Sequence, residues 1–146
     1  MINENKIIEL YSQFGIEDDE ILIEEFNKII EDRSASNLIK SEACCGIGDV
    51  ISLIAPELGE DLGYTYYKKA LEYDNNSLDA RIGICMIYTS YSAPIDSILD
   101  ENEYLENLKI LIEKYDEISD KRIKKNIVQL MKNMVNHRIR VTTKGI

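Results

Sequence analysis

The sequence predicts an all-α protein of about seven antiparallel helices packed into one compact domain. Apolar residues recur at intervals of three and four along nearly the whole chain, which is the period of a helix with one buried face. Only 2 prolines and 7 glycines interrupt the 146 residues, so long helices are seldom broken. Apolar side chains make up 45% of the chain, and the length suits a single domain spanning residues 1–146.

The first two helices are predicted by amphipathic spacing. The first is expected to end at Gly15, because glycine favours helix termination. The second is expected over residues 18–32, with an acidic first turn that suits the positive end of the helix dipole. Its predicted buried face consists of Leu22, Phe26, Ile29 and Ile30.

The middle of the chain should contain three further helices. The third is expected over residues 37–54 and should end before Pro56, because the residue preceding proline resists the helical conformation. Its Gly46 and Gly48 are poor helix formers and indicate an irregularity. After a turn at 57–59, a fourth helix should end near Tyr73. A polar turn then leads into a fifth helix over 78–91.

The last two helices have the clearest periodicity. Residues 102–115 and 120–136 each carry apolar side chains at helical spacing, which predicts an antiparallel helical hairpin. Residues 137–146 form a basic tail, within which 138–141 are expected to be a short extended segment.

Charge is distributed unevenly along the chain, and this pattern narrows the class of partner. The formal net charge is −10, yet residues 121–146 hold 8 of the 17 Lys and Arg and no Asp or Glu. Residues 1–120 therefore carry 9 basic and 27 acidic side chains, a net charge of −18. The negative electrostatic field of these side chains repels nucleic acid and raises the rate at which basic proteins associate. The alternative explanation is that an acidic surface simply keeps the protein soluble.

Cysteine usage and the terminal sequence favour a cytoplasmic location. The number of cysteines is odd, and Cys44 and Cys45 are adjacent, which is a poor arrangement for structural disulfides. Cys85 stands in an apolar run and is predicted to be a small buried hydrophobe. The only histidine, His137, is distant in sequence, so no metal site is expected. Neither a secretory leader nor an apolar run of about 20 residues is present, so no signal peptide and no membrane partner are expected.

The fourth and fifth predicted helices carry a pattern known from helical repeats. Tyr67 precedes an Ala-Leu pair that starts at Ala70, and an Asp-Asn turn follows. The next helix opens with Ala80 and continues to Tyr88. This pattern resembles the junction between two tetratricopeptide repeats, over about residues 44–91.

The resemblance implies helical hairpins stacked in two layers, with tyrosines filling the space between layers and small residues allowing close approach. The sequence departs from the repeat pattern at Asn75, where proline is usual, at Gly63, where alanine is expected, and at Cys85, where glycine is usual. We therefore expect tetratricopeptide-like packing and no regular array. Because stacked repeats generally need three or more copies, the flanking helices should complete the core.

Tyrosine and carboxylate side chains are concentrated in the same middle part of the chain. Six of the nine tyrosines lie between residues 64 and 91, and tyrosine is a favoured interface residue. Helical steps of 100° scatter neighbouring tyrosines around the axis, so at least one of those at 64, 66 and 67 should be exposed or half-exposed. The alternative is that these are core and rim tyrosines. The residues predicted to contact a partner are Glu57, Glu60, Asp61, Tyr64, Asp79, Met86, Tyr88 and Tyr91.

The sequence contains no recognised catalytic pattern: no nucleophile elbow, no phosphate-binding glycine loop and no zinc-protease histidine pair. We therefore expect a non-enzymatic protein that binds a protein with a basic surface and needs no cofactor. The leading hypothesis is an immunity protein or antitoxin of a bacterial toxin system. It would neutralise a cationic toxin, such as a nuclease, by masking its active site with carboxylates that imitate phosphates.

Two alternatives remain open at this point. One is an adaptor or chaperone that holds a peptide or client protein in a groove between tetratricopeptide-like helices, with Asp79, Ile82 and Met86 on the concave side. The other is an enzyme, or a nucleic-acid binder that acts through the basic C-terminal helix. The acidic remainder of the chain opposes nucleic-acid binding, and the C-terminal cations are expected to neutralise the acidic helices of the same chain.

Overall fold

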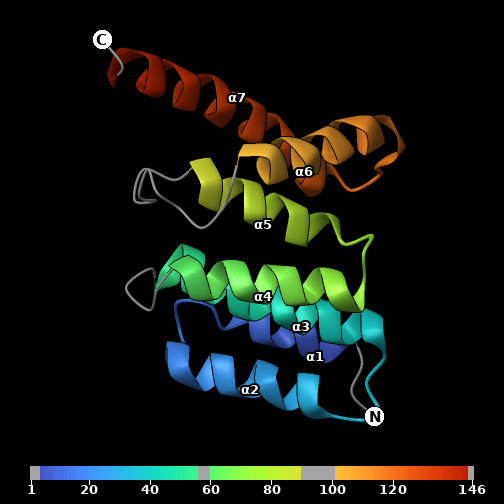
Figure 1. Cartoon of the computed structure of the whole chain (residues 1–146). Coiled ribbons are helices and arrows are strands. Elements are labelled where there is room, and N and C mark those ends of the chain that lie inside the picture. Colours follow the sequence, from blue (N-terminus) through green and yellow to red (C-terminus); the bar gives the residue numbers. More distant parts are fainter. Residues whose placement is uncertain (1–3, 56–59, 90–100, 145–146) are drawn as a thin grey trace.

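Seven α-helices account for most of residues 4–55, 60–89 and 101–144, which the computed structural model describes (Figure 1). The side chains of residues 60, 61 and 137–144 lie outside this description. No strand occurs within these ranges. The elements are α1 (Glu4–Ser12), α2 (Asp19–Glu31), α3 (Asn37–Asp49), the π-helix η1 (Val50–Ile54), α4 (Glu60–Tyr73), α5 (Leu78–Thr89), α6 (Glu101–Lys114), the 3₁₀-helix η3 (Tyr115–Glu117) and α7 (Lys121–Lys144).

The helices form two layers. Each odd-numbered helix packs against the next odd-numbered one, α1 on α3, α3 on α5 and α5 on α7, so these four make one continuous layer. The helices α2, α4 and α6 pack against this layer and lie toward the viewer in Figure 1, with α1 and α3 behind α2 and α4. The stack thus runs from α1 and α2 at one end to α6 and α7 at the other.

Helix α5 joins two hydrophobic clusters. The larger cluster is built from α1 to α4 and receives Ala80, Ile84 and Ile87 from α5. The smaller cluster is shared with α6 and α7 and receives Ile82 and Cys85 from α5. A helix that buries residues on several faces in this way is apolar nearly all round, which is the expected sequence of a central helix. The two ends of the stack are therefore held together through α5.

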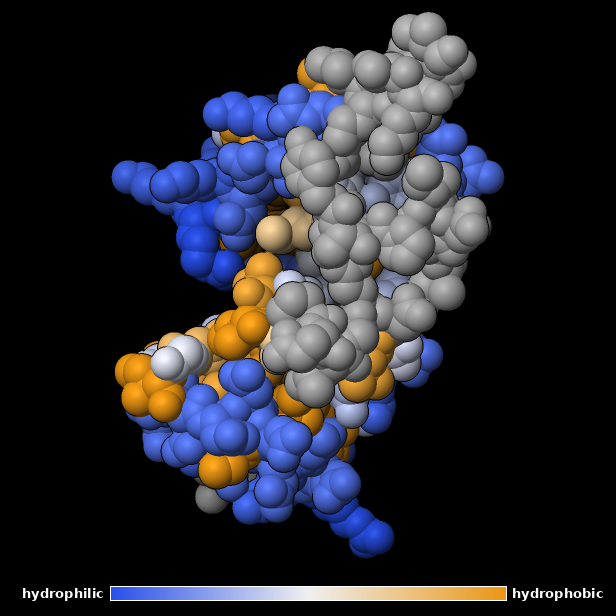
Figure 2. Space-filling view, turned by 90° about the vertical axis from the view of Figure 1, so that its left-hand side faces the viewer, coloured by the Kyte–Doolittle hydropathy of each residue, from blue (hydrophilic) through white to orange (hydrophobic). Residues whose placement is uncertain are grey.

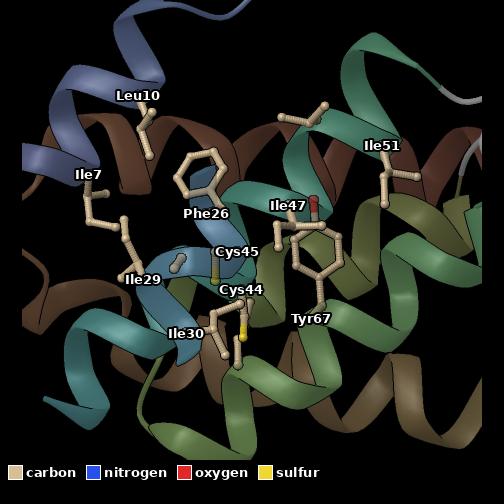
Figure 3. Packing of buried hydrophobic residues seen from close by; sticks show 14 of the residues in the cluster. Ile7, Leu10, Phe26, Ile29, Ile30, Cys44, Cys45, Ile47, Ile51 and Tyr67 are labelled. Atoms are coloured by element: carbon tan, nitrogen blue, oxygen red, sulfur yellow. The ribbon is translucent and has the colours of Figure 1, made fainter. Parts of the chain in front are cut away.

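Tyr67 of α4 fills the space at which α3, α4 and α5 meet (Figure 3). Only 1% of its surface is exposed. A Cβ added at Gly48 of α3 would lie 2.6 Å from its ring, and one added at Gly83 of α5 would lie 2.4 Å from it. A Cβ added at Gly46 of α3 would likewise lie 2.5 Å from the ring of Phe26 on α2. These glycines allow aromatic rings to lie directly against helical backbone.

Most predicted helices are present close to their expected bounds. All four residues of the predicted face of α2 are buried, and the side chain of Asp18 caps the helix by accepting from the amides of Glu20 and Ile21. The expected helix over residues 37–54 is α3 followed by the π-helix η1. Gly46 and Gly48 lie within the regular part of α3, so the irregularity begins after them. The expected turn at 57–59 and the end of the fifth helix at 90–91 lie outside the described residues.

The expectation of an extended segment at residues 138–141 is wrong. Helix α7 continues without interruption to Lys144. The physical reason is that the sequence offers neither glycine nor proline between Asp120 and Gly145, so nothing ends the helix earlier. The predicted pair 102–115 and 120–136 is present as α6 and α7, which share the smaller cluster. None of the described helices combines the length and hydropathy needed to cross a bilayer.

The contact between Gly83 and Tyr67 predicts the effect of a single methyl group. We expect Gly83→Ala to lower the free energy of unfolding by about 1 to 3 kcal/mol, because overpacking against a buried ring outweighs the gain in helix propensity. Urea unfolding followed by circular dichroism measures this. In the background Tyr67→Leu the same alanine should cost clearly less, since the ring that it meets is gone. Equal costs in both backgrounds would contradict the assignment of the glycine to this contact.

Candidate functional site

A pocket of about 390 Å³ lies between the odd-numbered helices. It is lined by residues of α1, α3 and α5, by Ser77 just before α5, and by Arg122 at the start of α7. Figure 2 shows the molecule hollowed between its lower half, which holds α1 and α3, and its upper half, which holds α7. The ionisable residues of the lining are Glu4, Tyr11, Glu42, Cys45, Asp49, Asp79 and Arg122.

Asp49 is the most deeply placed carboxylate of the pocket. It is the last residue of α3, and its two oxygens accept hydrogen bonds from two tyrosine hydroxyls. Tyr11 of α1 donates to Oδ2 over 2.6 Å, and Tyr67 of α4 donates to Oδ1 over 2.6 Å. Asp49 therefore ties three helices together. Burial raises its pKa to about 6, and the two tyrosine hydrogen bonds offset part of this effect.

Glu42 lies two turns before Asp49 and on the same face of α3. Its Oε2 atom has no exposed surface and no hydrogen-bond partner among the described residues. Burial raises the pKa of Glu42, and the negative charges of Glu4, Asp79 and Asp74 add to this increase. Leaving a buried polar oxygen without a partner costs about 1 to 3 kcal/mol, so the placement of this carboxylate is unfavourable for the folded chain.

Arg122 is the only cation among the described residues that line this pocket. Its two terminal nitrogens lie 3.3 Å from Oδ1 of Asp79 on α5, and one of them is 3.9 Å from Asp120. The guanidinium side chain is 61% exposed, so this contact is a long and solvated ion pair that contributes little to stability. The described lining thus contains one arginine and the carboxylates of Glu4, Glu42, Asp49 and Asp79. At pH values above the pKa of Asp49, the pocket therefore carries an excess of negative charge.

Of the predicted contact residues whose side chains the structure describes, one lines the pocket and three do not. Asp79 is the one in the lining. Tyr64 is half-buried, and its hydroxyl donates to both carboxylate oxygens of Glu103 on α6, at 2.9 and 3.1 Å. Tyr88 stacks on Tyr104 of α6, with ring centroids 4.4 Å apart.

The remaining predicted contact residues are placed elsewhere or lie outside the description. Met86 is 38% exposed on α5 and does not line the pocket. Glu60 and Asp61 belong to the first turn of α4, and their side chains are not described. Glu57 and Tyr91 lie outside the described residues.

The described tyrosines are buried or half-buried, and none is fully exposed. Tyr64 and Tyr66 are half-buried while Tyr67 is buried, as the scattering of neighbouring positions around a helix predicts. Tyr11, Tyr64 and Tyr67 direct their hydroxyls to carboxylates of this chain. In the described part of the chain, tyrosine thus contributes more to internal hydrogen bonds and ring stacking than to an open surface.

Sequence reasoning did not assign Tyr11, Glu42, Asp49 and Arg122 to a site, and these are four of the seven ionisable residues in the described lining. One signal was present in the sequence: Asp49 is the only charged residue between positions 43 and 55. A single carboxylate in such an apolar run is expected to be at least partly buried, and Asp49 is half-buried. A carboxylate so placed requires hydrogen-bond partners. The partners themselves come from α1 and α4, and their approach depends on the tertiary packing.

Comparisons with protein-family models, with curated proteins and with solved structures returned no match to this chain. The described residues include no group of three or more His, Cys, Asp or Glu arranged to hold a metal ion. The pocket therefore has to be interpreted from its own chemistry. A carboxylate whose pKa is strongly raised, lying in a pocket beside further acidic groups, marks a candidate functional site.

The three cysteines are free thiols and all are buried. Burial raises the pKa of Cys44 to about 11 and that of Cys85 to about 12, and it raises the pKa of Cys45 well above the ordinary value. We expect no rapid reaction of the folded protein with Ellman's reagent at pH 7.5, and three reactive thiols after guanidinium unfolding. Fast release of thiolate from the folded chain would contradict the burial of these side chains.

The raised pKa of Asp49 predicts a pH dependence of stability. Folding moves this pKa from its ordinary 3.8 to about 6, so between these values the folded state holds a proton that the unfolded state has lost. The contribution of Asp49 to the free energy of unfolding therefore falls as the pH rises from about 4 to about 7. Relative to Asp49→Asn, which does not titrate there, the wild type should lose roughly 1 to 3 kcal/mol over this window.

Urea unfolding of both proteins at pH 4, 5, 6 and 7 measures this difference. The asparagine variant is a matched control, because its side-chain oxygen accepts from one tyrosine and its amide donates to the other. All other titrating groups are shared by the two proteins and cancel in the comparison. Parallel stability curves would show that the pKa of Asp49 is not raised by folding.

Proposed function

We propose that this chain is a protein-binding protein, and no enzyme, that captures a partner with a basic surface in the hollow between its odd-numbered helices. The excess of carboxylates in the pocket carries this proposal. Among the described lining residues, four acidic side chains stand against one arginine. A positively charged group from outside would offset this excess of negative charge.

The distribution of charge along the chain also favours a basic partner. Residues 1–120 carry a net charge of −18, so a basic protein is attracted over a distance comparable to the Debye length before any contact forms. Complementary charge of this kind raises the association rate and disfavours partners of like sign.

Within this class we propose an immunity protein or antitoxin that neutralises a cationic toxin of bacterial origin, such as a nuclease. Carboxylates displayed on a rigid helical layer can occupy the basic cleft in which a nuclease holds phosphates. The side chain of Asp49 argues for binding over acid–base catalysis, because each of its oxygens already accepts a hydrogen bond from a tyrosine of the same chain. The free thiols are compatible with a cytoplasmic location.

The second candidate is an adaptor or chaperone that holds a peptide in the same hollow. It is favoured by the alternation of helices between two layers, which we propose to be tetratricopeptide-like, and by Asp79, which lines the pocket. Of the other residues expected on the concave side, Ile82 is buried between α5, α6 and α7, and Met86 is partly exposed outside the pocket lining.

The proposal predicts a salt-sensitive complex with a basic protein. The tagged chain is used to capture partners from the organism of origin, and each captured protein is then purified and titrated by isothermal calorimetry. We expect the dissociation constant to rise at least about tenfold between roughly 50 and 500 mM NaCl, because screening removes much of the attraction. Neutral or acidic partners whose binding is indifferent to salt would contradict the proposal.

The same purified pair separates the two candidate functions. An inhibitor should abolish the partner's own activity, such as nucleic-acid cleavage, at a one-to-one ratio. An adaptor should leave that activity intact and should bind an isolated peptide of the partner about as well as the whole protein. Loss of activity without any peptide binding would favour the immunity protein.

A further inference from the structure

The two ends of the helical stack expose different side chains. On α2, at one end, Ile21 is the one large apolar side chain that is exposed. At the other end, α6 and the described part of α7 expose five large apolar side chains, which are Leu105, Ile112, Val128, Met131 and Val135. A terminal helix of a stack needs a polar outer face to remain soluble on its own. Helix α2 meets this condition, whereas α6 and α7 do not.

The exposed strip of α6 has an apolar centre and an acidic edge. Leu105 and Ile112 lie three and four residues from Leu108, which is buried in the smaller cluster, so all three share one side of the helix. Glu106 and Glu113 directly follow the two exposed residues, and steps of about 100° per residue place them on the flank away from Leu108. Both glutamates are exposed. Passing outward from the cluster, α6 therefore presents first apolar and then acidic side chains.

The corresponding strip of α7 has an apolar centre and a basic edge. Met131 lies one turn after Ile127, which is buried in the same cluster, and Val128 lies three residues before Met131. Lys125 and Lys132 are exposed and lie on the flank away from Ile127. Across this end of the stack the order is thus an acidic edge on α6, an apolar centre that borders the smaller cluster, and a basic edge on α7.

The charges of the two edges favour one kind of partner. In the described part of the chain, Glu106, Lys125 and Lys132 take part in no ion pair. A wholly basic partner is repelled by the lysine edge, and a nucleic acid or an acidic partner is repelled by the glutamate edge. A surface that matches both edges carries the same charges in the reverse order, and a second copy of this chain offers such a surface when it is turned by 180°.

The register of α6 and α7 brings opposite charges of two copies to the same level. The two helices run in opposite directions (Figure 1), and the ammonium nitrogen of Lys124 lies 4.8 Å from the ring centroid of Tyr115. Counting equal rises from this contact puts Glu106 level with Lys132, within about one residue. The other glutamate and lysine of the edges lie seven residues away and come level in the same way. A twofold axis parallel to the helices preserves these levels and places each glutamate opposite a lysine of the second copy.

Helix α7 extends past the rest of its own chain. Met134 is the last of its described side chains that packs against the smaller cluster, yet the helix continues to Lys144. Figure 1 shows its C-terminal part projecting beyond α6. A helix in a protein gains most of its stability from the packing of an apolar face. A second copy that lies against α7 would supply this packing at the exposed Val135.

We propose that the outer faces of α6 and α7 are the contact surface of a symmetric dimer formed by two copies of this chain. Helix α6 of each copy lies antiparallel on α7 of the other, the apolar centres are buried against each other, and each acidic edge meets a basic edge. Because both copies use the same surface, the assembly closes at two chains. This inference is independent of the proposed function and of the pocket.

Sedimentation equilibrium of the untagged full chain tests for the dimer directly. We expect the apparent mass to rise from that of the 16.8 kDa chain to twice this value as the protein concentration increases from roughly 1 to 300 µM, as a reversible association requires. The mass should not rise beyond two chains, since the contact surface is used up in the dimer.

Charge reversal tests which edges meet. Glu106→Lys and Lys132→Glu should each raise the dissociation constant of the dimer about fivefold or more, because the contact occurs twice and each reversed charge then faces one of like sign. The variant that combines both substitutions exchanges the two charges and should return to within about threefold of the wild type. Glu24→Lys, at an exposed position of α2, changes the net charge as Glu106→Lys does and should stay within about twofold.

A polar substitution tests the apolar centre. Met131→Ser should raise the dissociation constant about tenfold or more, because apolar area is lost from the middle of the contact. Leu38→Ser, at an exposed apolar position of α3, is the matched control and should have an effect of less than about twofold. Circular dichroism of every variant establishes that the change in association arises in a folded protein.

A chain that stays monomeric over the whole concentration range, a mass that grows beyond two chains, or a combined charge variant as weak as the single ones would each overturn the proposal. Other occupants of this surface give outcomes of their own. A monomer that retards RNA in a gel and loses this property in Lys132→Glu would assign the surface to nucleic acid. A monomer that loses a basic protein partner in Met131→Ser would assign it to that protein. Both outcomes would remove the dimer, whereas absence of any basic partner would leave it standing.

Discussion

The hydrogen bonds from Tyr67 and Tyr11 to Asp49 connect the packing of the helices with the chemistry of the pocket. The ring of Tyr67 lies against backbone at Gly48 and Gly83, and this contact sets how closely α3, α4 and α5 approach. Its hydroxyl then reaches the carboxylate of Asp49, which also receives the hydroxyl of Tyr11. A buried carboxylate is destabilising unless it is hydrogen-bonded, so the position of α1 relative to α3 is coupled to the same charge. Packing and pocket geometry therefore cannot change independently.

The pocket spans the joint between the two hydrophobic clusters. Its lining on α1 and α3 belongs to the larger cluster, and Arg122 belongs to α7, which packs in the smaller one. In the described part of the chain, α5 is the one helix that contributes to both clusters. The separation of Arg122 from the carboxylates of α3 thus depends on how α7 sits on α5, and the ion pair with Asp79 is a direct contact across that joint. A partner that engages the pocket would touch both ends of the stack and would favour the arrangement of α7 that it fits.

Much of the fold could be predicted from the sequence because it depends on local period and on composition. The buried face of α2, the turn before α5 and the pair of C-terminal helices follow from residues that lie close together in the chain. The site could be predicted only in part. The isolation of Asp49 in an apolar run shows that a buried carboxylate exists, yet its partners Tyr11 and Tyr67 lie 38 and 18 residues away. The roles of Gly48 and Gly83 are equally non-local, since a glycine within a helix signals close approach without naming what approaches.

The carboxylates of the pocket are a cost to the folded protein at neutral pH. Burial, with a smaller contribution from neighbouring carboxylates, raises the pKa values of Glu42 and Asp49, which means that their ionised forms are destabilised in the folded chain. The two hydrophobic clusters must offset this cost. A nearby cation would offset the repulsion between carboxylates, whereas the larger part of the cost, which comes from burial, would remain. Such an arrangement would be removed easily by a mutation to a neutral side chain, because most proteins gain stability when a buried charge is removed. Asp49 is retained by its hydrogen bonds to Tyr11 and Tyr67, which join α1, α3 and α4, whereas no hydrogen bond among the described residues offsets the burial of Oε2 of Glu42.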